Sequence, residues 1–128
     1  MTIELKLLVW SAALAFVQML LAVVGAMLQL GLPALLGNRD NLPKLSGWAG
    51  RAMRAHYNML ENLVLFAALV FAAQLAGRTN AMTALGAGIF FYSRLGYAFA
   101  YILGIRYLRT LLWTLSVIGL GVIFVQLL

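Results

Sequence analysis

The sequence predicts an all-α membrane protein, a bundle of four transmembrane helices, and two observations support this prediction. The chain of 128 residues is 65% hydrophobic and 9% charged, whereas soluble domains carry roughly 25% charged residues. Its apolar runs are continuous and exceed the stretch of about 20 residues that crosses a bilayer, and they lack the alternation of barrel strands. Because hydrocarbon offers the backbone no hydrogen bonds, these runs must be helices.

We expect a single domain of residues 1–128 that contains four helices. The apolar runs place them at about Ile3–Leu36, Trp48–Ala76, Ala81–Leu103 and Leu108–Leu128. Gly31 and Pro33 predict a kink near the end of the first helix, since proline removes a backbone donor. This first run is too long for the apolar region of a signal peptide, so we interpret it as a retained helix.

The basic residues predict the orientation of the bundle. One end carries Arg39, Lys44, Arg51, Arg54, Arg106 and Arg109, and the other carries Lys6 and Arg78. Basic loops stay in the cytoplasm, so we expect both termini on the non-cytoplasmic side. The net charge of +6 then reflects topology. No basic patch with interleaved aromatic residues lies outside the apolar runs, so we expect no nucleic-acid partner.

Cysteine and histidine usage excludes several kinds of site. The chain has no cysteine, which excludes disulfides, thiolate metal sites and a cysteine nucleophile. The lone His56 and one buried glutamate do not make a ligand set, so we expect no metal. We interpret His56 as a packing or interfacial residue.

Polar side chains form stripes on two predicted helices. The second helix carries Arg51, Arg54, Asn58 and Glu61 within about 80° of one another, and the third carries Arg94, Tyr97 and Tyr101 on one face. Both stripes reach hydrocarbon depth, where a lone charge costs several kcal/mol. We therefore predict that Glu61 meets a basic partner, with Arg94 and Arg54 as the candidates.

Two interpretations of these stripes remain open. Buried polar groups can simply join helices, at about 0.6 kcal/mol per hydrogen bond, but an intramembrane ionisable cluster is more typical of a site.

Two further sets of residues have structural interpretations. The aromatic belt at headgroup level would contain Trp48, Tyr107 and Trp113. Close helix packing would use Gly86, Gly88, Gly119 and Gly121.

The motifs on both stripes resemble the MAPEG family, the membrane-associated proteins in eicosanoid and glutathione metabolism. The family pattern Arg-x-x-x-Asn-x-x-Glu is matched by Arg54, Asn58 and Glu61. The pattern Arg-x-x-Tyr-x-x-x-Tyr is matched by Arg94, Tyr97 and Tyr101. Arg109, followed by Thr110, resembles the arginine at the start of the fourth helix to which the family's thiol activation is attributed.

The resemblance implies a homotrimer with a glutathione site between subunits, open to the cytosol. It implies that Arg109 activates the thiol, that Arg54, Asn58, Glu61, Tyr97 and Tyr101 bind glutathione, and that Arg51, Arg94 and Arg106 support the site. Arginine suits carboxylates, glutamate suits an ammonium group, and a cation favours a thiolate. Glutathione would serve as co-substrate, and the second substrate would be a lipophilic electrophile or a lipid hydroperoxide from the bilayer. Short loops suggest a bacterial member in the inner membrane.

The sequence also departs from the family pattern. No arginine lies near the end of the first helix, where Arg39 is the possible substitute, and Tyr57 occupies a position where the prostaglandin synthase has an arginine. The spacing after Tyr101 differs by about a residue, so Arg106 competes with Arg109 for the thiol. These differences argue against an eicosanoid-specific activity.

Two other functions stay open at this level. One is a non-catalytic membrane protein of the same fold that binds a lipid headgroup or another anion in the arginine-rich pocket. The other is an exchanger driven by proton binding at Glu61, although flanking arginines would keep this carboxylate ionised.

Overall fold

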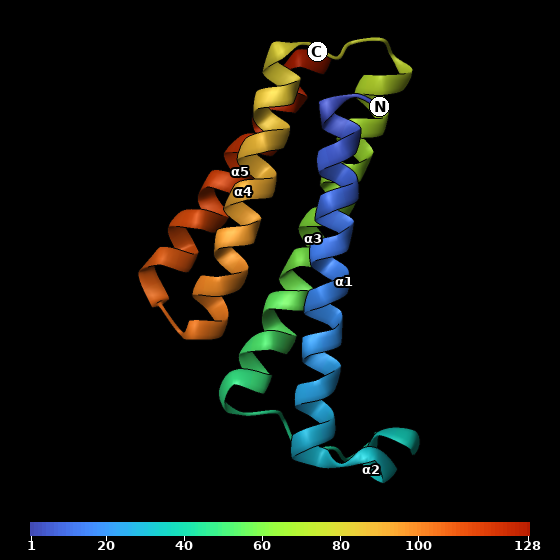
Figure 1. The fold of residues 1–128 in the computed structure, drawn as a ribbon, viewed down its shortest axis with the longest axis vertical. Helices are drawn as coiled ribbons and strands as arrows, with labels where there is room; N and C mark the ends of the chain where they lie inside the picture. The colour runs from blue at the N-terminus through green and yellow to red at the C-terminus, as the bar shows by residue number, and fades with distance from the viewer.

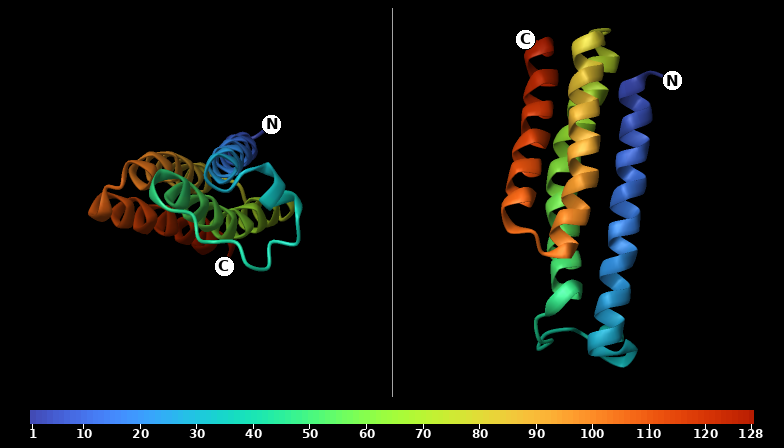
Figure 2. Two further views of the ribbon diagram at one scale, coloured as in Figure 1. Left: turned by 90° about the horizontal axis from the view of Figure 1, so that it is seen from below. Right: turned by 60° about the vertical axis from the view of Figure 1, so that its left-hand side comes forward.

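The computed structural model describes residues 1–128 and consists of helices joined by short connections (Figure 1). The helices are α1 (Ile3–Leu30), α2 (Leu32–Leu36), α3 (Gly47–Leu75), α4 (Ala81–Leu103) and α5 (Arg106–Leu127). The long helices α1, α3, α4 and α5 lie side by side along one axis, with both termini at the same end (Figures 1 and 2). The predicted all-α class is confirmed.

Three of these helices, α1, α3 and α5, are long and apolar enough to cross a membrane. Helix α4, with 23 residues, is as long as α5, with 22, so length does not separate them. Helix α4 is less apolar because it carries Ser93, Arg94 and three tyrosines. It nevertheless runs alongside the others in the bundle (Figure 2). The chain is therefore a helical membrane protein, while the count of four spans stays a prediction.

The first predicted helix is divided in two at Gly31. Gly31 has φ +83°, a conformation that glycine adopts without steric penalty, and its backbone N–H donates to the carbonyl of Met27 at 3.0 Å. Pro33 then lies in the first turn of α2, where its missing N–H is not needed. The predicted kink is thus a complete break, and α2 turns away from the bundle axis (Figure 1).

The last helix begins two residues earlier than predicted, at Arg106. Gly104 follows the last residue of α4 in the left-handed conformation, with φ +78°, and only Gly104 and Ile105 lie between the two helices. Arg106 and Arg109 consequently both belong to the first turn of α5. This short connection fixes the arginines beside the end of α4.

The apolar core fills the middle of the bundle and the half near the termini. Met59, Phe66, Phe90 and Ile123 are each 0% exposed, and the rings of Phe66 and Phe90 stack with centroids 4.1 Å apart. Because this half is filled by apolar side chains, the polar stripes meet nearer the opposite end.

Helices α4 and α5 make the most extensive contact in the bundle, and two glycines permit it. A Cβ added at Gly86 would lie 2.7 Å from the carbonyl oxygen of Gly119, and one added at Gly119 would lie equally close to that of Gly86. Nothing lies within 4 Å of the corresponding positions at Gly88 and Gly121. The expectation of close packing is right for the first pair and wrong for the second.

We predict that Gly86→Ala and Gly119→Ala each lower the stability of the protein in detergent by about 1–3 kcal/mol, because the new methyl group meets rigid backbone. Gly88→Ala and Gly121→Ala are the matched controls, and they should leave stability unchanged or slightly raised, since alanine is the better helix former. Thermal unfolding measures all four. Melting of Gly86→Ala at or above the temperature of the controls would contradict this account of the interface.

Candidate functional site

Tyr101 on α4 lies between two arginines from neighbouring helices. Arg54 Nε on α3 donates a hydrogen bond to the Tyr101 hydroxyl at 3.1 Å. The guanidinium carbon of Arg109 on α5 lies 4.8 Å from the centroid of the same ring. A cation over an aromatic face is attracted by the ring quadrupole. Tyr101 therefore joins α3, α4 and α5 through one side chain.

Tyr97 extends this arrangement one turn deeper into the bundle. Its ring lies 5.5 Å from that of Tyr101, edge to face, because residues four apart share one side of a helix. The guanidinium carbon of Arg94 lies 4.2 Å from the Tyr97 centroid. Arg94 is 1% exposed. The predicted stripe on α4 is thus a continuous column in which arginines lie against tyrosine rings.

A cavity of about 170 Å³ opens beside this column. It is lined by Asn58, Tyr97, Arg109, Thr110 and Trp113. Typical ligand pockets measure about 300–1,000 Å³, so one chain provides only part of a site for a molecule the size of a tripeptide. The cavity lies where α3, α4 and α5 meet, at the end of the bundle where α5 begins.

Sequence reasoning missed Trp113 and gave Thr110 no role of its own. We expected Trp113 in the aromatic belt, yet it lines the cavity while remaining 40% exposed. The spacing contained the signal, because a residue four positions after Arg109 shares its face of α5.

The supporting arginines lie in different surroundings. Arg51 Nε donates to the carbonyl of Ile102 at 2.9 Å, so its charge lies at the carboxyl end of α4, where a cation is favoured. Arg106 is exposed. Of the two arginines that compete for thiol activation, Arg109 lines the cavity.

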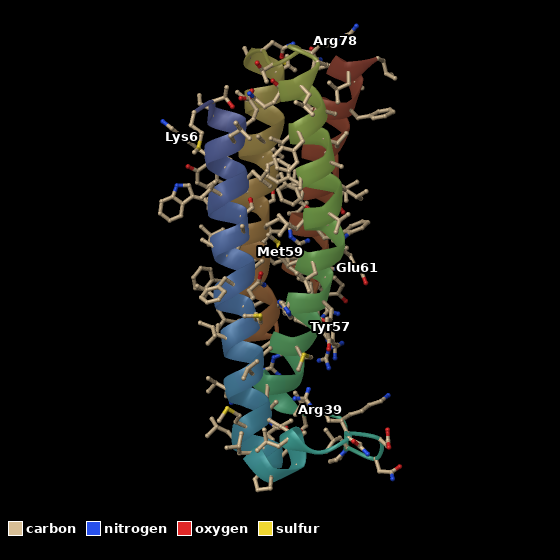
Figure 3. All side chains as sticks on the ribbon, turned by 90° about the vertical axis from the view of Figure 1, so that its right-hand side faces the viewer. Lys6, Arg39, Tyr57, Met59, Glu61 and Arg78 are labelled. Atoms are coloured by element: carbon tan, nitrogen blue, oxygen red, sulfur yellow. The ribbon has the colours of Figure 1, made fainter.

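The predicted pairing of Glu61 with Arg94 or Arg54 is wrong within one chain. All three guanidinium nitrogens of Arg94 are buried without a hydrogen-bond partner, and Arg54 hydrogen-bonds Tyr101 instead. Glu61 is exposed, and Figure 3 shows it with Tyr57 on the outer side of α3, away from Met59 in the interior. Arg54 and Glu61 share this exposed face of α3. Only the longer Arg54 side chain reaches back to α4, where it meets Tyr101.

Asn58 and His56 also have defined places on α3. The side-chain amide nitrogen of Asn62 donates two hydrogen bonds to Asn58. One goes to the Asn58 backbone carbonyl at 2.9 Å and the other to Asn58 Oδ1 at 3.3 Å. This contact holds the Asn58 side chain beside the cavity. His56 is 8% exposed, so it is a packing residue and not an interfacial one.

These features define a class: a helical membrane protein with an arginine–tyrosine site built from three helices. A model of the MAPEG family matches residues 7–128, nearly the whole chain. The protein belongs to the MAPEG family, as its motifs predicted. A search of curated proteins and a search of solved structures each found no match.

We predict that Tyr101→Leu destabilises the protein by about 1–2 kcal/mol. The substitution removes the ring contacts with Tyr97 and Arg109, and it leaves Arg54 and Arg109 without the side chain that lies between them. Tyr101→Phe should cost about 0.5–1 kcal/mol, because it removes only the hydrogen bond to Arg54. Tyr107→Leu is the matched control, as Tyr107 is 87% exposed. Denaturant unfolding in mild detergent measures the series, and equal stability of the two leucine variants would exclude a structural role for Tyr101.

Proposed function

We propose that the protein is a membrane-embedded, glutathione-dependent transferase or peroxidase that acts on lipophilic electrophiles or lipid hydroperoxides. The observation that carries the proposal is the contact of Arg54 and Arg109 with Tyr101, next to a cavity lined by Tyr97 and Arg109. Membership of a family that includes glutathione-dependent transferases and peroxidases supports it.

The residues match the groups of glutathione, which has two carboxylates, one ammonium group and a thiol. Arg54 is exposed apart from its bond to Tyr101, so its other nitrogens are free to bind a carboxylate in a forked geometry. Glu61 suits the ammonium group, and Asn58 and Tyr97 offer hydrogen bonds at the cavity wall. Arg109 in the cavity stabilises the thiolate by charge attraction.

The proposed assembly is a homotrimer whose sites lie between copies. Two observations favour a second copy at the site: the cavity in one chain is small, and Glu61 is exposed on a helix able to cross a membrane. An ionised carboxylate facing lipid costs several kcal/mol, and a boundary between subunits that holds a cationic group beside Glu61 offsets this cost. The mass of the detergent-solubilised protein tests the stoichiometry, and a stable monomer would exclude it.

The chemistry follows from the thiolate. In the transferase reaction its sulfur lone pair forms a bond to the electrophilic carbon, and the leaving group departs with its electron pair. In the peroxidase reaction the sulfur attacks the peroxide, which becomes an alcohol, and a second glutathione completes the disulfide and releases water. A site in the membrane brings a water-soluble thiol and a lipid-soluble partner together.

We place the site on the cytoplasmic side of a bacterial inner membrane. Arg39 lies at the α2 end of the bundle, whereas Lys6 and Arg78 lie at the opposite end with the termini (Figure 3). The α2 end also carries Lys44, Arg51 and Arg54, and basic ends stay in the cytoplasm. The chain contains no cysteine, so a single cysteine at Asn41 and an impermeant thiol reagent test the orientation; labelling from outside intact cells would reverse it.

We predict that Glu61→Gln weakens glutathione binding by about 10-fold or more, because a charge-assisted hydrogen bond contributes roughly 1.5–3 kcal/mol. Calorimetry on the purified protein in detergent measures the dissociation constant. Asp40→Asn is the matched control, since it removes one carboxylate from an exposed loop. Equal weakening in both variants would mean that net charge, and not Glu61, governs binding.

We predict that Arg109→Ala abolishes the thiolate absorbance of bound glutathione and lowers kcat by about 100-fold, the usual effect of removing one group that stabilises a developing anion. Arg106→Ala, on the same turn of α5 but exposed, should change both quantities little. The reverse result would assign thiol activation to Arg106.

A second candidate is a non-catalytic protein that binds a lipid headgroup or another anion at the same arginines. It is favoured if wild-type protein fails to bind glutathione at millimolar concentration yet retains an anionic lipid through purification. Proton-coupled transport in vesicles would instead favour an exchanger, for which the exposed Glu61 is the available carboxylate.

A further inference from the structure

A second cavity, of about 430 Å³, lies beside Arg54 at the end of the bundle where α3 begins. It is lined by Lys44 and Leu45 from the connection between α2 and α3, and by Gly50, Met53, Arg54 and Tyr57 from α3 itself. Its volume falls within the range of ligand pockets, which the smaller cavity at Arg109 does not reach. The roles assigned so far use only one of its residues, Arg54.

The connection that carries Lys44 is held against two helices. The side-chain amide of Gln29 on α1 donates to the carbonyl of Ser46 at 2.7 Å and accepts from the Ser46 N–H at 3.0 Å. Gly50 lets the connection approach α3 closely, because a Cβ at this position would lie 2.6 Å from the carbonyl oxygen of Leu45. The residues next to Lys44 are therefore fixed to α1 and α3, and the wall that Lys44 forms is a defined part of the fold.

The charges around this cavity are all of one sign. Lys44 and Arg54 are cationic, and none of the three acidic residues of the chain lines the cavity. Arg54 uses its Nε for the Tyr101 hydroxyl, which leaves both Nη atoms to donate elsewhere. A cleft lined by charges of one sign attracts ligands of the opposite sign. The cavity is thus suited to an anionic group.

The position of the cavity on α3 indicates which group of glutathione it would hold. Arg54 and Glu61 are seven residues apart on the same exposed face, about 10 Å along the helix axis. The glutamyl carboxylate of glutathione shares a carbon atom with the ammonium group, which the proposed site assigns to Glu61. The carboxylate beside Arg54 is then the one at the glycine end, and an extended tripeptide of about 10 Å spans the interval. Figure 3 shows the connection after α2 on the side of α3 that carries Tyr57 and Glu61.

We propose that Lys44 is a further glutathione-binding residue, which together with Arg54 holds the carboxylate of the glycine end; this assignment rests on the proposed function. Arg54 supplies a planar pair of donors, and Lys44 supplies a compact charge on a flexible side chain. Both therefore bind one carboxylate through charge-assisted hydrogen bonds. A thiol compound that lacks this carboxylate loses both contacts, so the cavity at Lys44 favours glutathione over smaller thiols.

Calorimetry with two ligands, on the full chain in detergent, tests the role of Lys44. The ligands are glutathione and its ethyl ester at the glycine carboxylate. Lys44→Gln should weaken the binding of glutathione by about 5-fold, the upper end for an ion pair open to solvent, and Lys44→Arg should retain wild-type affinity. The ester should bind the wild type more weakly than glutathione does. Lys44→Gln should leave the affinity for the ester unchanged, because the charge that Lys44 would contact is already absent.

Arg39→Gln is the matched control. Arg39 lies in the same connection, but its Nε donates to the carbonyl of Leu35 at 2.8 Å and it does not line the cavity, so its loss should leave binding unchanged. Unaltered glutathione affinity in Lys44→Gln, an equal loss in Arg39→Gln, or an equal loss for the ester would overturn the assignment while the proposed function stands. Failure of the wild type to bind glutathione would overturn the proposed function and this assignment together.

Discussion

The low dielectric of hydrocarbon is the constraint on which the rest of this structure depends. It requires every backbone group to be paired inside its own segment, which accounts for the long helices and for the confinement of turns to the ends of the bundle. It also makes each charged side chain in a spanning helix costly. Arg109 on α5 and Arg94, which is buried inside the bundle, therefore need compensation from within the protein.

That compensation comes from aromatic rings and not from carboxylates. Arg94 lies over Tyr97, Arg109 lies over Tyr101, and Arg54 hydrogen-bonds the Tyr101 hydroxyl. A ring face stabilises a cation without cancelling its charge. The arginines consequently stay electropositive, which is the property that a site for an anionic thiol compound requires.

The two halves of the bundle contribute differently, since the half near the termini supplies stability and the other half carries the candidate site. Toward the termini, the stacked Phe66 and Phe90 and the close approach of Gly86 to Gly119 hold α3, α4 and α5 together through apolar packing. This rigid half fixes the register of α4, and so the depth at which Tyr97 and Tyr101 meet the other helices. The two-residue link of Gly104 and Ile105 then brings Arg109 back over the Tyr101 ring.

The sequence by itself determined the all-α class, the approximate positions of the long helices, a distortion near Gly31 and Pro33, and the two motifs of the family. Hydropathy and glycine and proline chemistry are local properties, so the chain order is enough to read them. The tertiary structure alone decided that Glu61 faces outward, that Arg94 is buried against Tyr97, that Trp113 lines the cavity, and that Gly86 packs closely where Gly88 does not. Helical periodicity gives the angle between residues on one helix, but the rotation of each helix against its neighbours is set by packing between segments distant in the chain.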